Sequence, residues 1–178
     1  YYWRVSASND YGTSGWSAPT WSFTTPCGSP ITYTGKIYNT VQIGNQCWLK
    51  ENLDIGTMIL GSQNPTNNGT IEKYCYNDDQ NNCNTYGGLY QWNEAMAYNK
   101  TPGARGICPD GWHIPTTEEF GKLKATVNND GNALKSLGQG TGNGAGTNTS
   151  GFSAVRGAPV PPLVFSLILE MTLTSGVL

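Results

Sequence analysis

The sequence predicts an α+β fold of short antiparallel strands and two helices. Three observations lead to this prediction. Apolar and polar residues alternate in several segments before residue 50, apolar residues recur at helical spacing in two later segments, and turn-forming residues separate these segments. The 178 residues are enough for one good-sized domain, or for one domain and a piece of another.

The composition excludes two classes of partner. Only 12 % of the residues are charged and the net charge is −2, without a cluster of Lys and Arg. A nucleic-acid or anionic-membrane surface needs such a cluster to displace counterions, so we expect neither partner. The apolar run 163–169 is shorter than the roughly 20 residues of a membrane span and is followed by Glu170. We therefore expect no membrane span in this chain.

Residues 1–25 predict a β-hairpin. Large apolar residues alternate with small polar ones on both sides of a turn at Asn9–Gly12, and Pro26 stops the second strand. Two strands cannot bury their own face, so the hairpin should belong to a larger sheet. The segments Tyr1-x-Trp3-x-Val5-x-Ala7-x-Asn9 and Trp21-Ser22-Phe23-Thr24-Thr25 resemble the last two strands of a fibronectin type III domain, here truncated; an unrelated hairpin is the alternative.

A linker and a second hairpin follow. Residues 26–30 combine two prolines, a glycine and a serine, which is the composition of a linker. Beyond them Ile37, Val41 and Ile43 share one face of a predicted strand, and Gly44–Asn45 provides a two-residue turn to the returning strand. Loops are predicted over residues 61–70, 77–82 and 138–151.

The first helix is predicted over residues 88–98. Leu89, Trp92 and Met96 recur there at helical spacing. We expect this stripe to pack in the core rather than to face a ligand.

The second helix is predicted from Thr116 to about residue 127. Thr116 and Glu119 have the spacing of a capping box, in which each side chain bonds to the backbone N–H of the other residue. The apolar face of this helix should be formed by Phe120, Leu123 and Val127.

The segment 106–115 concentrates a thiol, two prolines, a tryptophan and the only histidine. A single histidine cannot build a two-histidine metal site, and Cys108 with His113 in a proline-bounded turn is a poor nucleophile and base pair. We expect a structural corner in which Trp112 enters the core, His113 is packed or hydrogen-bonded, and Pro115 leads into the second helix.

The five cysteines predict disulfides rather than a zinc site, because none stands in a C-x-x-C pair. Five is an odd number, so at least one thiol lacks a partner inside this chain.

Four blocks of residues then occur in a recognisable order: Tyr38-Asn39-Thr40-Val41-Gln42-Ile43-Gly44-x-Gln46-x-Trp48-x-x-Glu51-Asn52-Leu53, Tyr86-Gly87-Gly88-Leu89-Tyr90-x-Trp92-x-x-Ala95, Cys108-Pro109-x-Gly111-Trp112-His113-Ile114-Pro115-Thr116-x-x-Glu119-Phe120, and Gly151-Phe152-Ser153-Ala154. Over residues 31–156 the chain thereby resembles the FISUMP domain, the Fibrobacter succinogenes major paralogous domain. The resemblance implies a bacterial exported or surface-attached module with a fold similar to that of C-type lectins. Structural roles are expected for the motif residues Trp48, Trp92, Trp112, His113 and Pro115.

The tail over residues 157–178 departs from the family pattern. Family members continue with a glycine-rich strand, an aromatic-Trp-Ser-Ser block and a final strand that carries a cysteine, none of which this chain has. Our hypothesis is that a frameshift just after Arg156 replaced these strands. The loss of the late cysteine would leave Cys108 unpaired, so the resemblance implies disulfides among Cys27, Cys47, Cys75 and Cys83.

Resemblance and composition together predict a non-enzymatic binding or adhesion module, secreted or at the surface of the bacterial envelope. Its partner would be polysaccharide or a cell-surface protein, reached through exposed Trp and Tyr on long loops. The alternative is a structural spacer without a specific ligand.

Metal binding and glycoside hydrolysis are less favoured by the sequence than a binding or spacer module. No cofactor is expected, and Asn77–Asn81 fails as a calcium loop of the EF-hand type, since it lacks the glycine at position six and has Gly88 in place of the glutamate; a calcium site of another kind stays open. Glu94 and Glu119 are the paired acids that a glycoside hydrolase would use, but Glu119 already has a capping role.

Overall fold

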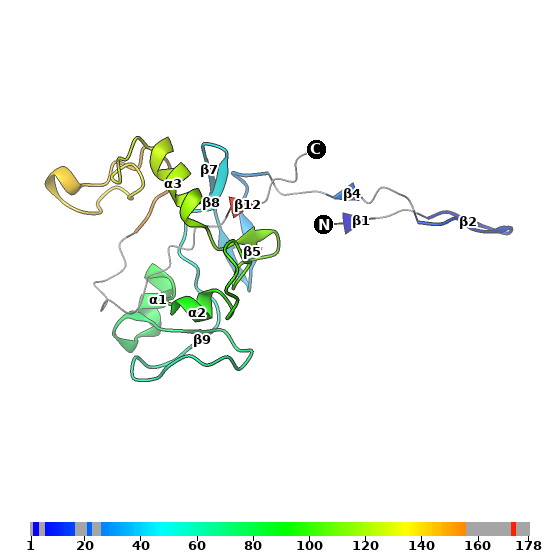
Figure 1. The fold of residues 1–178 in the computed structure, drawn as a ribbon, viewed down its shortest axis with the longest axis horizontal. Helices are drawn as coiled ribbons and strands as arrows, with labels where there is room; N and C mark the ends of the chain where they lie inside the picture. The colour runs from blue at the N-terminus through cyan, green and yellow to red at the C-terminus, as the bar shows by residue number, and fades with distance from the viewer. Residues whose placement is uncertain (1, 4–5, 17–20, 23–25, 156–171, 174–178) are drawn as a thin grey trace.

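The computed structural model describes residues 2–3, 6–16, 21–22, 26–155 and 172–173. These residues form a mixed α+β structure, as predicted, with short two-stranded sheets and three α-helices instead of two (Figure 1). The helices are α1 (Gln80–Tyr86), α2 (Trp92–Ala95) and α3 (Thr117–Thr126).

The N-terminal segment is a hairpin. Strand β1 (Tyr2–Trp3) pairs antiparallel with β4 (Trp21–Ser22), and between them β2 (Ser8–Asn9) pairs with β3 (Gly12–Thr13). At its tip the side chain of Asn9 accepts a hydrogen bond from the N–H of Tyr11. Figure 1 shows this arm extending away from the rest of the chain. The hairpin is therefore confirmed, whereas its origin in a fibronectin type III domain stays a prediction.

Two further hairpins open the main domain. Strand β5 pairs with β6 and strand β7 pairs with β8, both antiparallel, and Gly44 takes a φ of 62° in the tight turn between β7 and β8. Additional strands are β9 and β10, which pair in parallel, and β11 and β12, which pair antiparallel. The bounds are β5 (Ile31–Tyr33), β6 (Lys36–Tyr38), β7 (Thr40–Ile43), β8 (Gln46–Leu49), β9 (Thr57–Met58), β10 (Glu72–Lys73), β11 (Trp112–His113) and β12 (Thr172–Leu173).

The prediction that Ile37 shares one face of a single strand with Val41 and Ile43 is wrong. Ile37 is 67 % exposed, and its neighbour Tyr38 is buried instead. Successive side chains of a strand point to opposite faces, so burying Tyr38 forces Ile37 outward. The strand also ends at Tyr38, and Asn39 separates it from β7.

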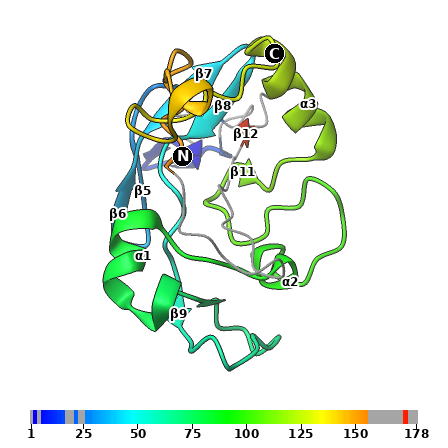
Figure 2. The ribbon, with the colours of Figure 1, turned by 90° about the vertical axis from the view of Figure 1, so that its left-hand side faces the viewer.

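The buried side chains form two clusters. Trp48 is fully buried beside Phe152 and Leu123, where α3 packs on the β7–β8 hairpin. The larger cluster contains Trp112 together with Tyr90, Leu53, Ile114 and other buried residues. Figures 1 and 2 place α3 with β7 and β8 at one end of the domain and α1, α2 and β9 at the other. The predicted core position of Trp112 is confirmed, and Trp48, for which a structural role was expected, is buried as well.

Helix α3 begins with the predicted capping box. Thr116 Oγ1 accepts from the N–H of Glu119, and Glu119 Oε2 accepts from the N–H of Thr116 at 2.8 Å. On its apolar face Leu123 is buried, while Phe120 is 43 % exposed and contacts Trp48 with 6.1 Å between the ring centroids. Phe120 thus lies at the margin of the core.

The predicted helix over 88–98 is shorter than expected. Only Trp92–Ala95 is helical, because Leu89 pairs with Tyr74 in a β-bridge and because Ala97 and Tyr98 take φ values of 48° and 57°, which end the helix. Leu89 and Met96 are buried as predicted, but Trp92 is 52 % exposed. The expectation that Trp92 packs in the core is therefore wrong.

The predicted loop over 77–82 is also corrected. A 3₁₀ turn at Tyr76–Asp78 leads into α1, whose N-cap Asp79 accepts a hydrogen bond from the N–H of Asn81. No apolar periodicity marks this polar helix in the sequence; the cap and the disulfide of Cys83 hold it.

The tail prediction concerns residues that are mostly outside the described ones. Only Thr172–Leu173 is described there, paired with Trp112–His113. In the parts of the chain that are described, no helix has the length and hydropathy of a membrane span.

Candidate binding site

An open cavity of about 440 Å³ lies among β6, residues 50–54 and the C-terminal end of α1. This volume falls in the range of about 300–1,000 Å³ that small-molecule sites occupy. Figure 2 shows β6 and α1 on the same side of the domain. The lining residues that matter for its chemistry are Lys36, Ile37, Lys50, Glu51, Asn52, Asp54, Asn84, Thr85 and Tyr86.

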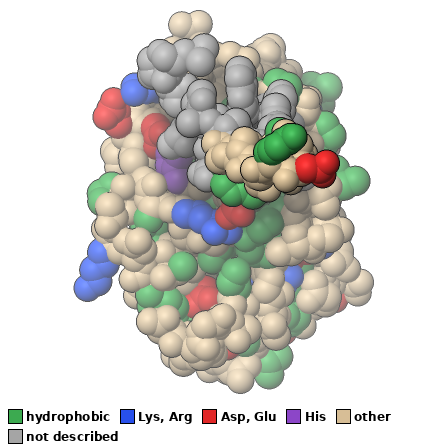
Figure 3. Space-filling view, turned by 90° about the vertical axis from the view of Figure 1, so that its right-hand side faces the viewer, with side chains coloured by type: hydrophobic (Ala, Val, Ile, Leu, Met, Phe, Trp, Pro, Cys, Tyr) green, Lys and Arg blue, Asp and Glu red, His purple; other side chains and the backbone are tan. Residues whose placement is uncertain are grey.

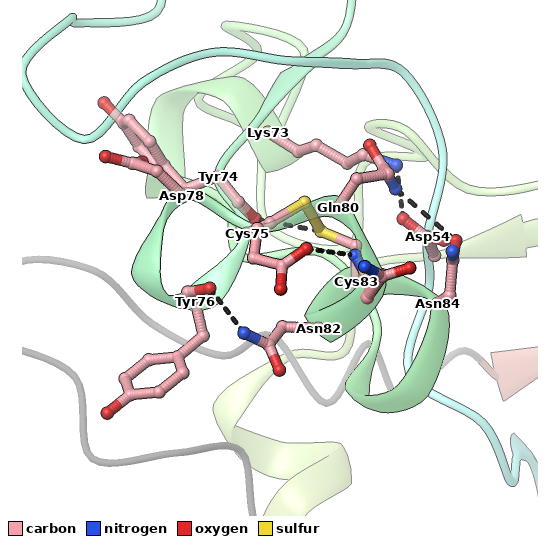
Figure 4. Close-up of a disulfide and its surroundings, with 12 residues drawn as sticks. Asp54, Lys73, Tyr74, Cys75, Tyr76, Asp78, Gln80, Asn82, Cys83 and Asn84 are labelled. Carbon is pink, nitrogen blue, oxygen red and sulfur yellow. Dashed lines mark hydrogen bonds and ion pairs between the residues drawn. A yellow bond between two sulfur atoms is a disulfide. The ribbon is translucent and has the colours of Figure 1, made fainter.

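A buried ion-pair network forms one wall. The carboxylate of Asp54 accepts from both Lys36 and Lys73, one oxygen to each ammonium. Asp54 and Lys73 are buried, whereas the side chain of Lys36 is 43 % exposed. Figure 4 shows Lys73 and Asp54 close to the Cys75–Cys83 disulfide. Since removing one partner of a buried pair costs about 3–5 kcal/mol, this wall is held in place by its charges.

The opposite wall is fixed by Asn52. Its side-chain amide donates to the carbonyl oxygen of Tyr86 at 2.7 Å, which ties residues 50–54 to the end of α1. Gly87 follows with a φ of 85°, and a Cβ there would lie 2.3 Å from that of Asn52. Tyr86 is 38 % exposed and lines the cavity, as does the exposed Ile37.

Two disulfides join the four cysteines that were predicted to pair. Cys27 bonds to Cys47, which ties the linker to β8. Cys75 bonds to Cys83, which ties α1 to the segment between β10 and the 3₁₀ turn (Figure 4). Cys108 is a free thiol and fully buried, and burial raises its pKa above the ordinary value. A buried thiol with a raised pKa has neither the access nor the thiolate character of a nucleophile.

The segment 106–115 has the structural role expected for it. Nε2 of His113 lies 2.8 Å from Oε1 of Glu119, the residue that caps α3. The N–H of Ile114 donates to the carbonyl oxygen of Ala104, and Pro115 is buried where the chain enters the helix. This segment does not line the cavity.

The two acids considered for hydrolysis occupy different surroundings. Glu94 is 3 % exposed; its Oε1 accepts from the N–H of Glu72, and its Oε2 has no hydrogen-bond partner in the described part of the chain. Burial and the neighbouring Glu94 raise the pKa of Tyr98 to about 12. Glu119 is committed to Thr116 and His113. Neither acid lines the cavity.

The residues proposed for calcium have structural partners. Asp78 accepts from the N–H of Gly61, and Asp79 caps α1. Within the described ranges, no three His, Cys, Asp or Glu side chains gather as metal ligands would.

Few charges interrupt the face that Figure 3 presents, where neutral surface predominates between isolated acidic and basic side chains. Sequence reasoning missed the cavity, because Lys36, Asp54 and Lys73 belong to no motif and come together only through the tertiary packing of segments that are far apart in sequence. The exposed Tyr86 within the second sequence block was the one signal available.

These features define a small, disulfide-bonded α+β domain with an open polar cavity. Residues 41–160 match the family model described as Fibrobacter succinogenes major domain, and the chain belongs to this family. No curated protein and no solved structure matched the chain. The family identification by sequence is thus confirmed, whereas the likeness to the C-type-lectin fold stays a prediction.

Proposed function

We propose that this domain is a non-enzymatic binding module, secreted or at the bacterial cell surface, and that its cavity holds polysaccharide. The two disulfides support the location, because such bonds persist in an oxidising, extracellular environment. The observation that carries the proposal is the exposed ring of Tyr86 in an open cavity with polar walls.

The lining suits a sugar. A tyrosine ring offers an apolar surface to the C–H face of a pyranose and a hydroxyl at its tip. The amides of Asn52 and Asn84 can donate and accept, and the hydroxyl of Thr85, which donates to the carbonyl oxygen of Asn81, can accept, as the alternating hydroxyls of a polysaccharide require.

The absence of catalysis is part of the proposal. Glu94 is buried and Glu119 caps a helix, so both acids that hydrolysis would need have structural roles. The C-type-lectin-like fold and the fibronectin type III origin of the N-terminal hairpin belong to the same proposal and rest on sequence resemblance.

Binding to a glycan array by the whole chain tests this function. We expect the chain to bind one group of polysaccharides. Tyr86→Ala should lower the affinity about tenfold or more, because the variant lacks the aromatic surface that the sugar would cover on binding. The hydrogen bond that Tyr86 accepts uses its backbone, so the variant should keep its fold. Trp92→Ala is the matched control, since Trp92 is exposed but outside the cavity.

The outcomes separate the alternatives. Equal losses for both aromatic variants would place binding elsewhere. No retention on any glycan would favour the spacer, and capture of a cell-surface protein that Tyr86→Ala abolishes would favour a protein partner.

A further inference from the structure

We propose that the cavity selects acidic polysaccharide and that the carboxylate of a uronic acid residue lies between Lys36 and Lys50. This inference rests on the proposed function and adds the charge of its ligand.

The charged residues of the cavity, taken with the buried Lys73 that pairs with one of them, have a positive balance in a chain whose net charge is −2. Lys36 and Lys50 line the cavity together with Glu51 and Asp54, and the buried Lys73, which does not line it, pairs with Asp54, so this group holds three positive and two negative charges. An anion entering the cavity therefore meets a favourable field.

The acids of the cavity are already satisfied. Asp54 gives one oxygen to each of two lysines. Glu51 accepts from the N–H of Asn39 at 2.6 Å and from its side-chain amide at 2.7 Å, using both oxygens. Each oxygen of the two carboxylates therefore already has a donor within the protein.

The lysines retain unused donors. Within the described residues the ammonium of Lys50 has no hydrogen-bond or ion-pair partner. The ammonium of Lys36 carries three N–H groups, and its one partner among these residues is Asp54. The buried Lys73 shares the charge of Asp54, so Lys36 is only partly neutralised. The free N–H donors of these two lysines would therefore bind a hydrogen-bond acceptor that carries negative charge.

The rest of the lining favours a sugar acid over an acidic peptide. Tyr86 and the polar groups of Asn84 and Thr85 stand on the α1 side of the same cavity, away from the lysines in sequence. A uronic acid places a carboxylate and several hydroxyls on one ring with an apolar face, which uses both parts of the lining. A glutamate side chain would use only the lysines.

The test compares the binding of polygalacturonate and alginate with that of their carboxyl-reduced forms, by affinity electrophoresis of the whole chain. We expect at least one acidic polymer to bind, with a loss of roughly tenfold on carboxyl reduction or in Lys50→Gln, and further weakening at high salt. Lys100→Gln removes the same charge from an exposed residue outside the cavity and should bind like the parent.

Each result decides the matter. If the reduced polymers bind as tightly and Lys50→Gln has no effect, the acidic preference is wrong while the proposed function stands. If poly-glutamate competes as well as the polysaccharide, the assignment to a sugar acid is wrong. Binding only of neutral glycans on the array also overturns this inference, whereas no glycan binding at all removes the proposed function itself.

Discussion

The side chains of His113 and Glu119 meet at the start of α3, with 2.8 Å between Nε2 and Oε1. The other carboxylate oxygen of Glu119 accepts from the N–H and the hydroxyl of Thr116. One carboxylate thus joins strand β11 to the N-terminus of the helix that packs over Trp48. The densest chemical cluster in the sequence thus connects β11 to α3 through hydrogen bonds.

Removing this carboxylate should weaken the fold. Glu119→Ala deletes the capping box and the contact with His113, and we expect a loss of about 1–2 kcal/mol in the free energy of unfolding. Urea denaturation measures it. Glu118→Ala, which loses only the exposed pair with Lys122, is the control and should change stability by less than about 0.5 kcal/mol. Equal losses of stability in the two variants would contradict a stabilising role for the contacts of Glu119.

The two disulfides should contribute unequally to stability. The pair Cys27–Cys47 is separated by 20 residues and Cys75–Cys83 by 8. The loop-entropy relation then gives a loss of about 3 kcal/mol for the double serine variant of the first pair and about 2.5 kcal/mol for the second. Chemical denaturation of both variants in an otherwise oxidised chain measures the difference. A much larger loss for the shorter loop would mean that native contacts outweigh chain entropy.

Cys108 should react only after unfolding. Its thiol is fully buried and its pKa is raised by burial, so an aromatic disulfide reagent should find almost no reactive thiol in the native chain and one per chain in denaturant. A Cys108→Ala variant should show none in either state. Fast reaction of the native protein, or a monomer in which Cys108 is oxidised, would contradict the structure.

Stability should fall in alkali. Burial raises the pKa of Tyr38, Tyr74 and Tyr90 above the ordinary value of 10.0, and burial with Glu94 raises that of Tyr98 to about 12. Because the folded phenols hold their protons longer than the unfolded ones, their contribution is complete below pH 10 and declines as the pH rises toward 12 and beyond.

Urea midpoints at about pH 8 and about pH 11 measure this decline, with about 1.4 kcal/mol lost per pH unit for the buried Tyr90 alone. The Cys108→Ala background keeps the thiol from adding its own titration. A stability that is constant over this interval would show that the buried phenols titrate normally.

Local patterns predicted much of the fold because their causes lie within a few residues. The capping box of Thr116 and Glu119 and the glycine turn after β7 each depend on neighbouring backbone groups, so the sequence was sufficient. The family blocks likewise identified the domain. Polar helix α1 was missed because a cap and a disulfide, not an apolar stripe, hold it.

The sequence by itself determined the mixed α+β class, the entry into α3, the burial of Trp112 and the family of the chain. Only the tertiary structure decided that Ile37 and Trp92 face outward and which cysteines bond. It also decided that Asp54 meets Lys36 and Lys73, and that Lys36, Asp54 and Tyr86 line one cavity. The physical reason is the distance along the sequence over which each interaction acts. Capping and turn formation act between adjacent residues, whereas a charged cavity is built from strands and loops that are far apart in sequence and are brought together by packing.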